Sequence, residues 1–150
     1  MTELLDSVAR YLAALGLGQY DASGAPQTAD WSIWPDGLPA EPDRAIGLAV
    51  YGPGTDLPDP GQPWAETRLQ VRVRGSTDPR ESRRKCAAIY GALHGLETVL
   101  MPGGLWVQDV VARQAEPAAL GPDGAGRHEH TCNFDVSYDQ PTAHRPALEG

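Results

Sequence analysis

The chain has 150 residues, of which 41% are hydrophobic and 21% charged, and these values are typical of one soluble globular domain rather than of a disordered chain. Twelve basic against twenty acidic residues give a formal net charge of −8, which excludes a general binder of nucleic acid or anionic membranes. Glycine (17) and proline (14) are frequent, so we expect long loops around a modest core. No apolar run reaches the length of a membrane span.

The first predicted element is an amphipathic helix over residues 2–15. Its apolar residues recur three and four positions apart and are Leu4, Leu5, Val8, Leu12 and Leu15. Thr2 suits the N-cap position, and Gly16 suits the stop after the helix. Because Glu3 and Asp6 place negative charge where a secretory signal needs positive charge, we expect no export.

Three strands are predicted after this helix. A short strand around residues 31–34 ends at the Pro35-Asp36-Gly37 turn, and the apolar run 45–51 is typical of a buried central strand. Residues 52–65 hold four prolines and three glycines, which predicts a long loop. Over residues 67–74 apolar side chains alternate with polar ones, so one face packs inward and the other presents three arginines.

A second amphipathic helix is predicted over residues 78–95. Asp78 is the expected N-cap, Pro79 the first helical residue, and Glu81 the partner that completes an acidic capping box. Gly95 is expected to end the helix.

Three further strands are predicted in the last third of the chain. Residues 98–101 and 105–114 flank a tight turn, and a turn cluster at 120–126 leads to the last strand at 128–138. The order predicts an α+β fold, a mostly antiparallel β-sheet with two amphipathic helices packed on one face. We expect a single domain over residues 1–139 and a flexible C-terminal arm over residues 140–150.

Candidate metal ligands gather on the last predicted strand, where His128, His130 and Cys132 share a face. Successive side chains on that face lie about 6–7 Å apart, which is wide for one metal ion, so a strand entering the core is the favoured interpretation. Cys86 and Cys132 fit no zinc or redox spacing, and we expect free, half-buried thiols. No nucleophile or phosphate-binding motif stands out, so we expect neither catalysis nor a cofactor.

Basic residues are concentrated in one stretch of this acidic chain. Seven of the twelve lie within eighteen positions: Arg68, Arg72, Arg74, Arg80, Arg83, Arg84 and Lys85. Because arginine pairs with carboxylates in bidentate geometry, a basic face meeting an acidic face of the next copy is the interpretation we favour. Such heterologous contacts form a ring when the rotation closes. The interface candidates are Arg68, Arg72, Arg74, Arg80 and Arg84; contact with the phosphates of passing DNA is the weaker alternative.

Four segments of the sequence carry a family resemblance. They are Tyr11-Leu12-Ala13-Ala14-Leu15-Gly16-Leu17-Gly18, Leu38-Pro39-Ala40-Glu41-Pro42-Asp43-Arg44-Ala45-Ile46, Arg68-Leu69-Gln70-Val71-Arg72-Val73-Arg74-Gly75 and Ala88-Ile89-Tyr90-Gly91-Ala92-Leu93-His94-Gly95. In their order and spacing, from Leu4 to Val136, the chain resembles the minor capsid or tail terminator proteins of long-tailed bacteriophages of actinobacteria and other Gram-positive bacteria.

The resemblance implies a structural virion protein and no catalytic residues. Such proteins form a homohexameric ring that caps the tail tube, stops its polymerisation and joins it to the head-neck connector. The implied partners are other copies of the chain, the tail tube protein, the head-completion or connector proteins, and genomic DNA that passes through the lumen; no membrane is implied. The implied location is the tail-neck junction of the virion, after assembly in the host cytoplasm.

Contacts between adjoining rings are assigned to the proline-rich loop and the C-terminal arm, with Asp56, Asp59 and Trp64 as candidates. Trp64 is the tryptophan most suited to anchoring a partner. Three alternatives stay open: a head-closure or stopper protein of the same neck, a small metal-dependent enzyme that uses His128 or His130, and a monomeric module that binds a host molecule.

Overall fold

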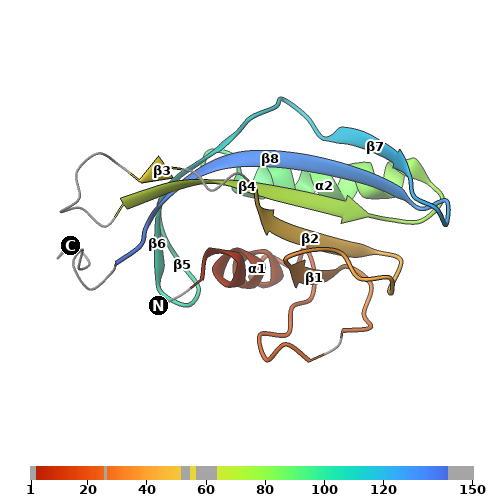
Figure 1. The fold of residues 1–150 in the computed structure, drawn as a ribbon, viewed down its shortest axis with the longest axis horizontal. Helices are drawn as coiled ribbons and strands as arrows, with labels where there is room; N and C mark the ends of the chain where they lie inside the picture. The colour runs from red at the N-terminus through yellow and green to blue at the C-terminus, as the bar shows by residue number, and fades with distance from the viewer. Residues whose placement is uncertain (1–2, 26, 52–54, 57–63, 142–150) are drawn as a thin grey trace.

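A computed structural model describes residues 3–25, 27–51, 55–56 and 64–141. Within them the structure has two helices and eight strands that form one curled sheet (Figure 1). In chain order these are α1 (Leu4–Ala14), β1 (Ser32–Pro35), β2 (Ala45–Val50), β3 (Thr55–Asp56), β4 (Trp64–Arg74), α2 (Pro79–Leu93), β5 (Glu97–Met101), β6 (Leu105–Ala112), β7 (Ala118–Pro122) and β8 (His128–Asp139).

The sheet has the strand order β1-β2-β4-β8-β6-β5, with β3 paired to β4 and β7 paired to β8. Only the β1–β2 pair is parallel, and the other pairs are antiparallel. Its centre is the long β4–β8 pair, whose register is continuous from Trp64 opposite Asp139 to Arg74 opposite Glu129. The predicted α+β class with a mostly antiparallel sheet is confirmed.

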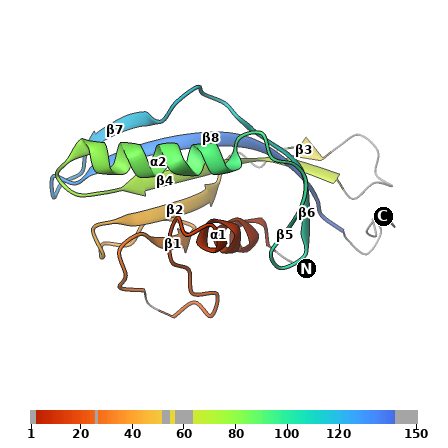
Figure 2. The ribbon, with the colours of Figure 1, turned by 180° about the vertical axis from the view of Figure 1, so that it is seen from behind.

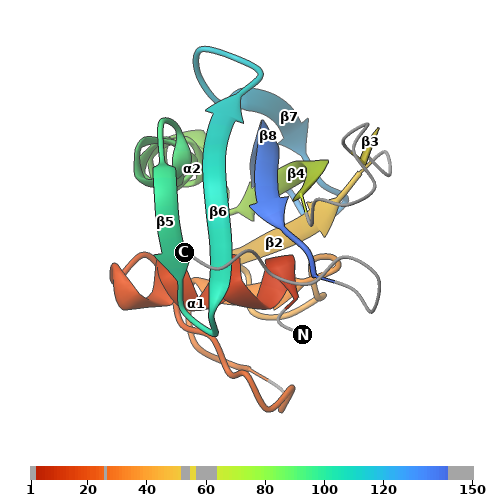
Figure 3. The ribbon, with the colours of Figure 1, turned by 90° about the vertical axis from the view of Figure 1, so that its left-hand side faces the viewer.

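Both helices pack on the same side of the sheet and share one hydrophobic core. The sheet contributes alternate residues of β4 and β8, such as Val71 and Phe134, and α2 contributes Cys86, Ile89 and Leu93, all fully buried. Figure 2 shows α2 running along β4 and β8, and Figure 3 shows β5 and β6 standing upright beside β8 with α1 crossing below. Alternation in the strands and a three-to-four spacing in the helices therefore produce the predicted arrangement.

The helix ends differ from expectation in two details. The N-cap of α1 is Glu3, and Thr2 lies outside the described residues. Asp78 does cap α2, because its carboxylate accepts a hydrogen bond from the Arg80 amide at 3.0 Å. The Glu81 side chain does not complete the capping box; it pairs with Arg44 and accepts a 2.6 Å hydrogen bond from the Ser76 hydroxyl. A guanidinium offers a carboxylate a stronger bond than a neutral amide does.

The strands differ from expectation where pairing rather than pattern defines them. β4 begins at Trp64 instead of residue 67, because residues 64–66 continue the ladder with β8. β7 begins before the predicted turn cluster and extends into it over residues 120–122. Its exposed residues Ala118 and Ala119 pair with β8 and give no alternating pattern. β3 lies within the predicted proline-rich loop.

Among the described residues, no helix is long and apolar enough to cross a membrane. Most of the predicted C-terminal arm, residues 142–150, lies outside the described residues. The proposed division of the chain at residue 139 therefore stays a prediction.

Candidate assembly surface

The outer face of the sheet, opposite the helices, carries a row of polar side chains on β4. They meet polar side chains of β8, either directly across the strands or on the diagonal. The pairs are Arg68 with Asp135, Gln70 with Asn133, and Arg72 with Glu129. The acidic partners of these arginines therefore belong to β8 of the same chain. The alternation of residues 128–138 predicts that strand but not its pairing with β4.

Arg68 and Arg72 are half-exposed but differ in how strongly they are held. The Arg68 guanidinium lies 4.0 Å from Asp135, whose carboxylate is also held by Arg113 at 2.9 and 3.1 Å. Arg72 pairs with Glu129, which is only 7% exposed. Exposed ion pairs contribute at most about 1 kcal/mol to stability, so the Arg68 guanidinium can leave Asp135 for another carboxylate at little cost in stability.

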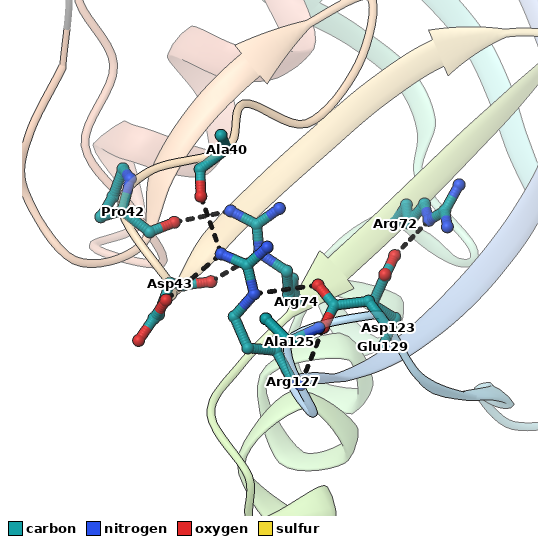
Figure 4. A network of polar contacts seen from close by, with 9 residues as sticks. All are labelled: Ala40, Pro42, Asp43, Arg72, Arg74, Asp123, Ala125, Arg127 and Glu129. Atoms are coloured by element: carbon teal, nitrogen blue, oxygen red, sulfur yellow. Dashed lines mark hydrogen bonds and ion pairs between the residues drawn. The ribbon is translucent and has the colours of Figure 1, made fainter.

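Arg74 has a different environment from the other arginines of β4, since it is only 4% exposed (Figure 4). Its guanidinium donates to the carbonyl oxygens of Pro42 at 2.6 Å and Asp43 at 2.9 Å. Burial and the neighbouring positive charge of Arg127 lower the pKa of Arg74. Arg127 in turn donates to Ala40 at 2.7 Å, so the two guanidiniums fasten the segment before β2 to the sheet.

The arginines of α2 lie on its exposed side. Arg80 is held by its own N-cap residue, since its guanidinium donates to the Asp78 carboxylate at 3.0 and 3.1 Å, and Asp78 raises the pKa of Arg80. Arg83 and Arg84 are exposed, and neither forms an ion pair with any described residue. Of the five candidates for the subunit interface, Arg84 is therefore the one without an ion pair in the described part of the chain, although its charge helps to lower the pKa of Asp78.

The candidates for contacts between rings are only partly described. Trp64 is half-buried at the start of β4, Asp56 belongs to β3, and Asp59 lies outside the described residues. Their role therefore stays a prediction.

His130 and Cys132 of β8 face α2, and His128 is half-buried at the start of the strand. The His130 ring lies against Ser82, with Nδ1 2.7 Å from Oγ, and burial lowers the pKa of His130. The sulfurs of Cys132 and Cys86 are 3.2 Å apart, and both thiols are free and fully buried rather than half-buried. In the described chain no three His, Cys, Asp or Glu residues gather in a geometry that could hold a metal ion. Sequence reasoning missed the Ser82–His130 bond, although both residues occupy inward positions of their elements.

Comparisons with known proteins place the chain in a family. The family model described as "Bacteriophage tail terminator protein" matches residues 11–140. A solved structure, "Virion of native gene transfer agent (GTA) particle", has a similar fold with a TM-score of 0.60 and 18% identity, and the match covers 91% of this chain and 94% of that one. No curated protein sequence matches. The chain therefore belongs to the bacteriophage tail terminator family and is a structural protein of the phage tail and neck.

Proposed function

We propose that the chain assembles as a ring that caps the finished tail tube, stops its polymerisation and joins it to the head-neck connector. The observation that carries this proposal is the family match, which extends over residues 11–140. These residues include the end of α1, all of α2 and every described strand. The likeness to a chain of a virion particle supports the same kind of role. A homohexamer is the ring size that the family resemblance favours.

The residues proposed for the subunit interface divide into two groups. Arg68, Arg80 and Arg84 are exposed and have either an exposed ion pair or none within the described chain, so acidic side chains of the adjacent subunit could reach them. Arg72 and Arg74 are already bound within their own chain to Glu129 and to the segment before β2. Their contribution to a ring is therefore to hold the outer face in shape.

The partners follow from the proposed position at the tail-neck junction. One side of the ring would meet the tail tube protein, and the other the head-completion or connector proteins, with Asp56, Asp59 and Trp64 contacting adjoining rings. Genomic DNA would pass through the lumen without base-specific contacts. Assembly would occur in the host cytoplasm before the protein becomes part of the virion.

Tube growth in the presence of the purified chain tests this role. The tail tube protein encoded by the same genome is polymerised with and without the chain, and tube length and end structure are measured by negative-stain microscopy. We expect shorter tubes that carry a cap at one end. Unaltered tube length, with binding only to head-neck proteins, would instead support the alternative of a head-closure or stopper protein.

A further inference from the structure

The outer face of the β5–β6 hairpin exposes large apolar side chains. Leu100 and Trp106 lie directly opposite each other across the two strands and are 62% and 36% exposed. Among the described strands, β5 is at the edge of the sheet and pairs with β6 alone. Adjacent exposed apolar groups of this size are typical of a surface that meets another protein.

Two carboxylates lie three ladder positions from this apolar pair, beyond the β-bulge between Val107 and Asp109 that shifts the alternation of faces in β6. Glu97 is exposed and stands directly opposite Asp109, which is half-exposed. Like charges placed directly opposite across two strands are destabilising, and among the described residues neither carboxylate has a cationic partner. An external positive charge would therefore pair with either of them.

The exposed side of α2 has the complementary properties. Arg83 and Arg84 carry the charges without an ion pair in the described chain, and the following exposed positions on the same side are the small residues Ala87, Ala88 and Gly91. Residues three and four apart share a helix face. The helix therefore presents a positive region followed by a flat region without large side chains.

On this face of α2, the presence of glycine at position 91 has no explanation in contacts within the chain. A Cβ added there would meet nothing within 4 Å, so no packing inside the chain requires glycine. Glycine is nevertheless among the least favourable residues within a helix. A close approach by another molecule would account for a position without a side chain here.

We propose that the β5–β6 surface of one copy (Glu97, Leu100, Trp106 and Asp109) docks on the α2 surface of the next copy (Arg83, Arg84, Ala87, Ala88 and Gly91). The carboxylates would pair with the arginines, and Leu100 and Trp106 would pack on the flat region around Gly91. The spacings agree: Glu97 and Leu100 are about 10 Å apart along β5, and Arg84 and Gly91 are about 10 Å apart along α2.

The two surfaces differ in chemistry, and the base of the hairpin is bonded to the C-terminal end of α2, where the Ala112 amide donates to His94 and the Gly95 amide to Val110. Figure 3 shows the hairpin of β5 and β6 extending away from α2 toward its own tip. Contact between unlike surfaces is heterologous and closes into a ring when the rotation between copies permits. The inference thus rests on the proposed ring and names the surfaces that build it.

A charge swap tests the inference. One half-swap is Arg83→Glu with Arg84→Glu, the other is Glu97→Lys with Asp109→Lys, and the full swap combines all four. Glu41→Lys with Glu116→Lys is the matched control, because both residues are exposed, outside both surfaces and without an ion pair in the described chain. Native mass spectrometry over a concentration series and imaging of chains bound at tube ends give the oligomeric state, and circular dichroism checks folding.

We expect the wild-type chain, the control and the full swap to form the ring, and each half-swap to remain monomeric. A one-to-one mixture of the two half-swaps brings an acidic helix face against a basic hairpin face and should also associate. Half-swaps that assemble like the wild type, or a folded full swap that does not, would overturn the inference.

Gly91→Gln separates assembly from folding. Glutamine is a better helix former than glycine, so the monomer should unfold at no lower temperature, whereas its side chain would hold the two surfaces apart and abolish the ring. A ring that tolerates Gly91→Gln contradicts the interface. If the wild-type chain forms rings but does not cap tubes, the proposed function fails while the interface stands; a wild-type chain that is monomeric both in solution and on tubes overturns the interface itself.

Discussion

Arg74 gives the sharpest stability prediction, because it looks equivalent to Arg68 in the sequence but not in the structure. The substitution is Arg74→Met, which keeps most of the aliphatic volume and removes the guanidinium. Arg74 is 4% exposed and donates to two backbone carbonyls of the segment before β2. Hydrogen bonds with a charged partner contribute about 1.5–3 kcal/mol each.

Part of that contribution is offset by the cost of burying the guanidinium, which lowers the pKa of Arg74. We therefore expect Arg74→Met to reduce the free energy of unfolding by about 2–4 kcal/mol, or to lower the melting temperature by roughly 5–12 °C for a chain of this size. The matched control is Arg68→Met. Its guanidinium lies 4.0 Å from Asp135, which keeps Arg113, so we expect a loss below about 0.5 kcal/mol.

Urea denaturation followed by tryptophan fluorescence measures both variants, with the slope of the free energy against urea checked for constancy. Equal losses for Arg74→Met and Arg68→Met would refute the view that Arg74 fastens the segment before β2. It would mean instead that the buried bonds to Pro42 and Asp43 add no net stability.

Three further predictions concern single sites. Gly91→Ala should raise the free energy of unfolding of the monomer by about 0.5–1 kcal/mol, because the added Cβ meets nothing within 4 Å. A melting temperature below that of the wild type would contradict this. Burial lowers the pKa of His130, so the unfolded state takes up the proton first and stability is lost as pH falls from 6.5 toward the folded pKa. In His130→Gln the melting temperatures at pH 7 and pH 5 should therefore lie closer together than in the wild type. An unchanged difference between them would show that His130 does not cause the pH dependence. Cys86 and Cys132 are fully buried, and their shared hydrogen bond and burial raise the pKa of Cys86; neither thiol should react with a thiol reagent until urea unfolds the chain, and fast native labelling would contradict the packing.

The sequence predicted most of the fold because its strongest patterns are local. The alternation over residues 67–74 and the capping residues Asp78 and Pro79 correspond to β4 and α2. β7 could not be predicted, because Ala118 and Ala119 are exposed and only the neighbouring β8 makes them a strand.

The candidate assembly surface was less predictable for a related reason. Arg68 and Arg74 occupy equivalent positions in the alternating pattern, and only the segment that crosses over the end of β4 buries one of them. Leu100 and Trp106 looked like ordinary strand residues, since their exposure depends on which face of the hairpin the helices leave uncovered. Local periodicity specifies which residues share a face, whereas contacts between distant segments decide which face is covered.

Tail length in virions tests the central claim most directly. The gene for this chain is deleted from the genome that encodes it, the chain is supplied from a plasmid, and tail lengths are measured by electron microscopy in both conditions. A tail terminator predicts overlong tubes in the deletion and restored length with the wild-type chain. Tails of normal length in the deletion, with only head attachment lost, would contradict the account.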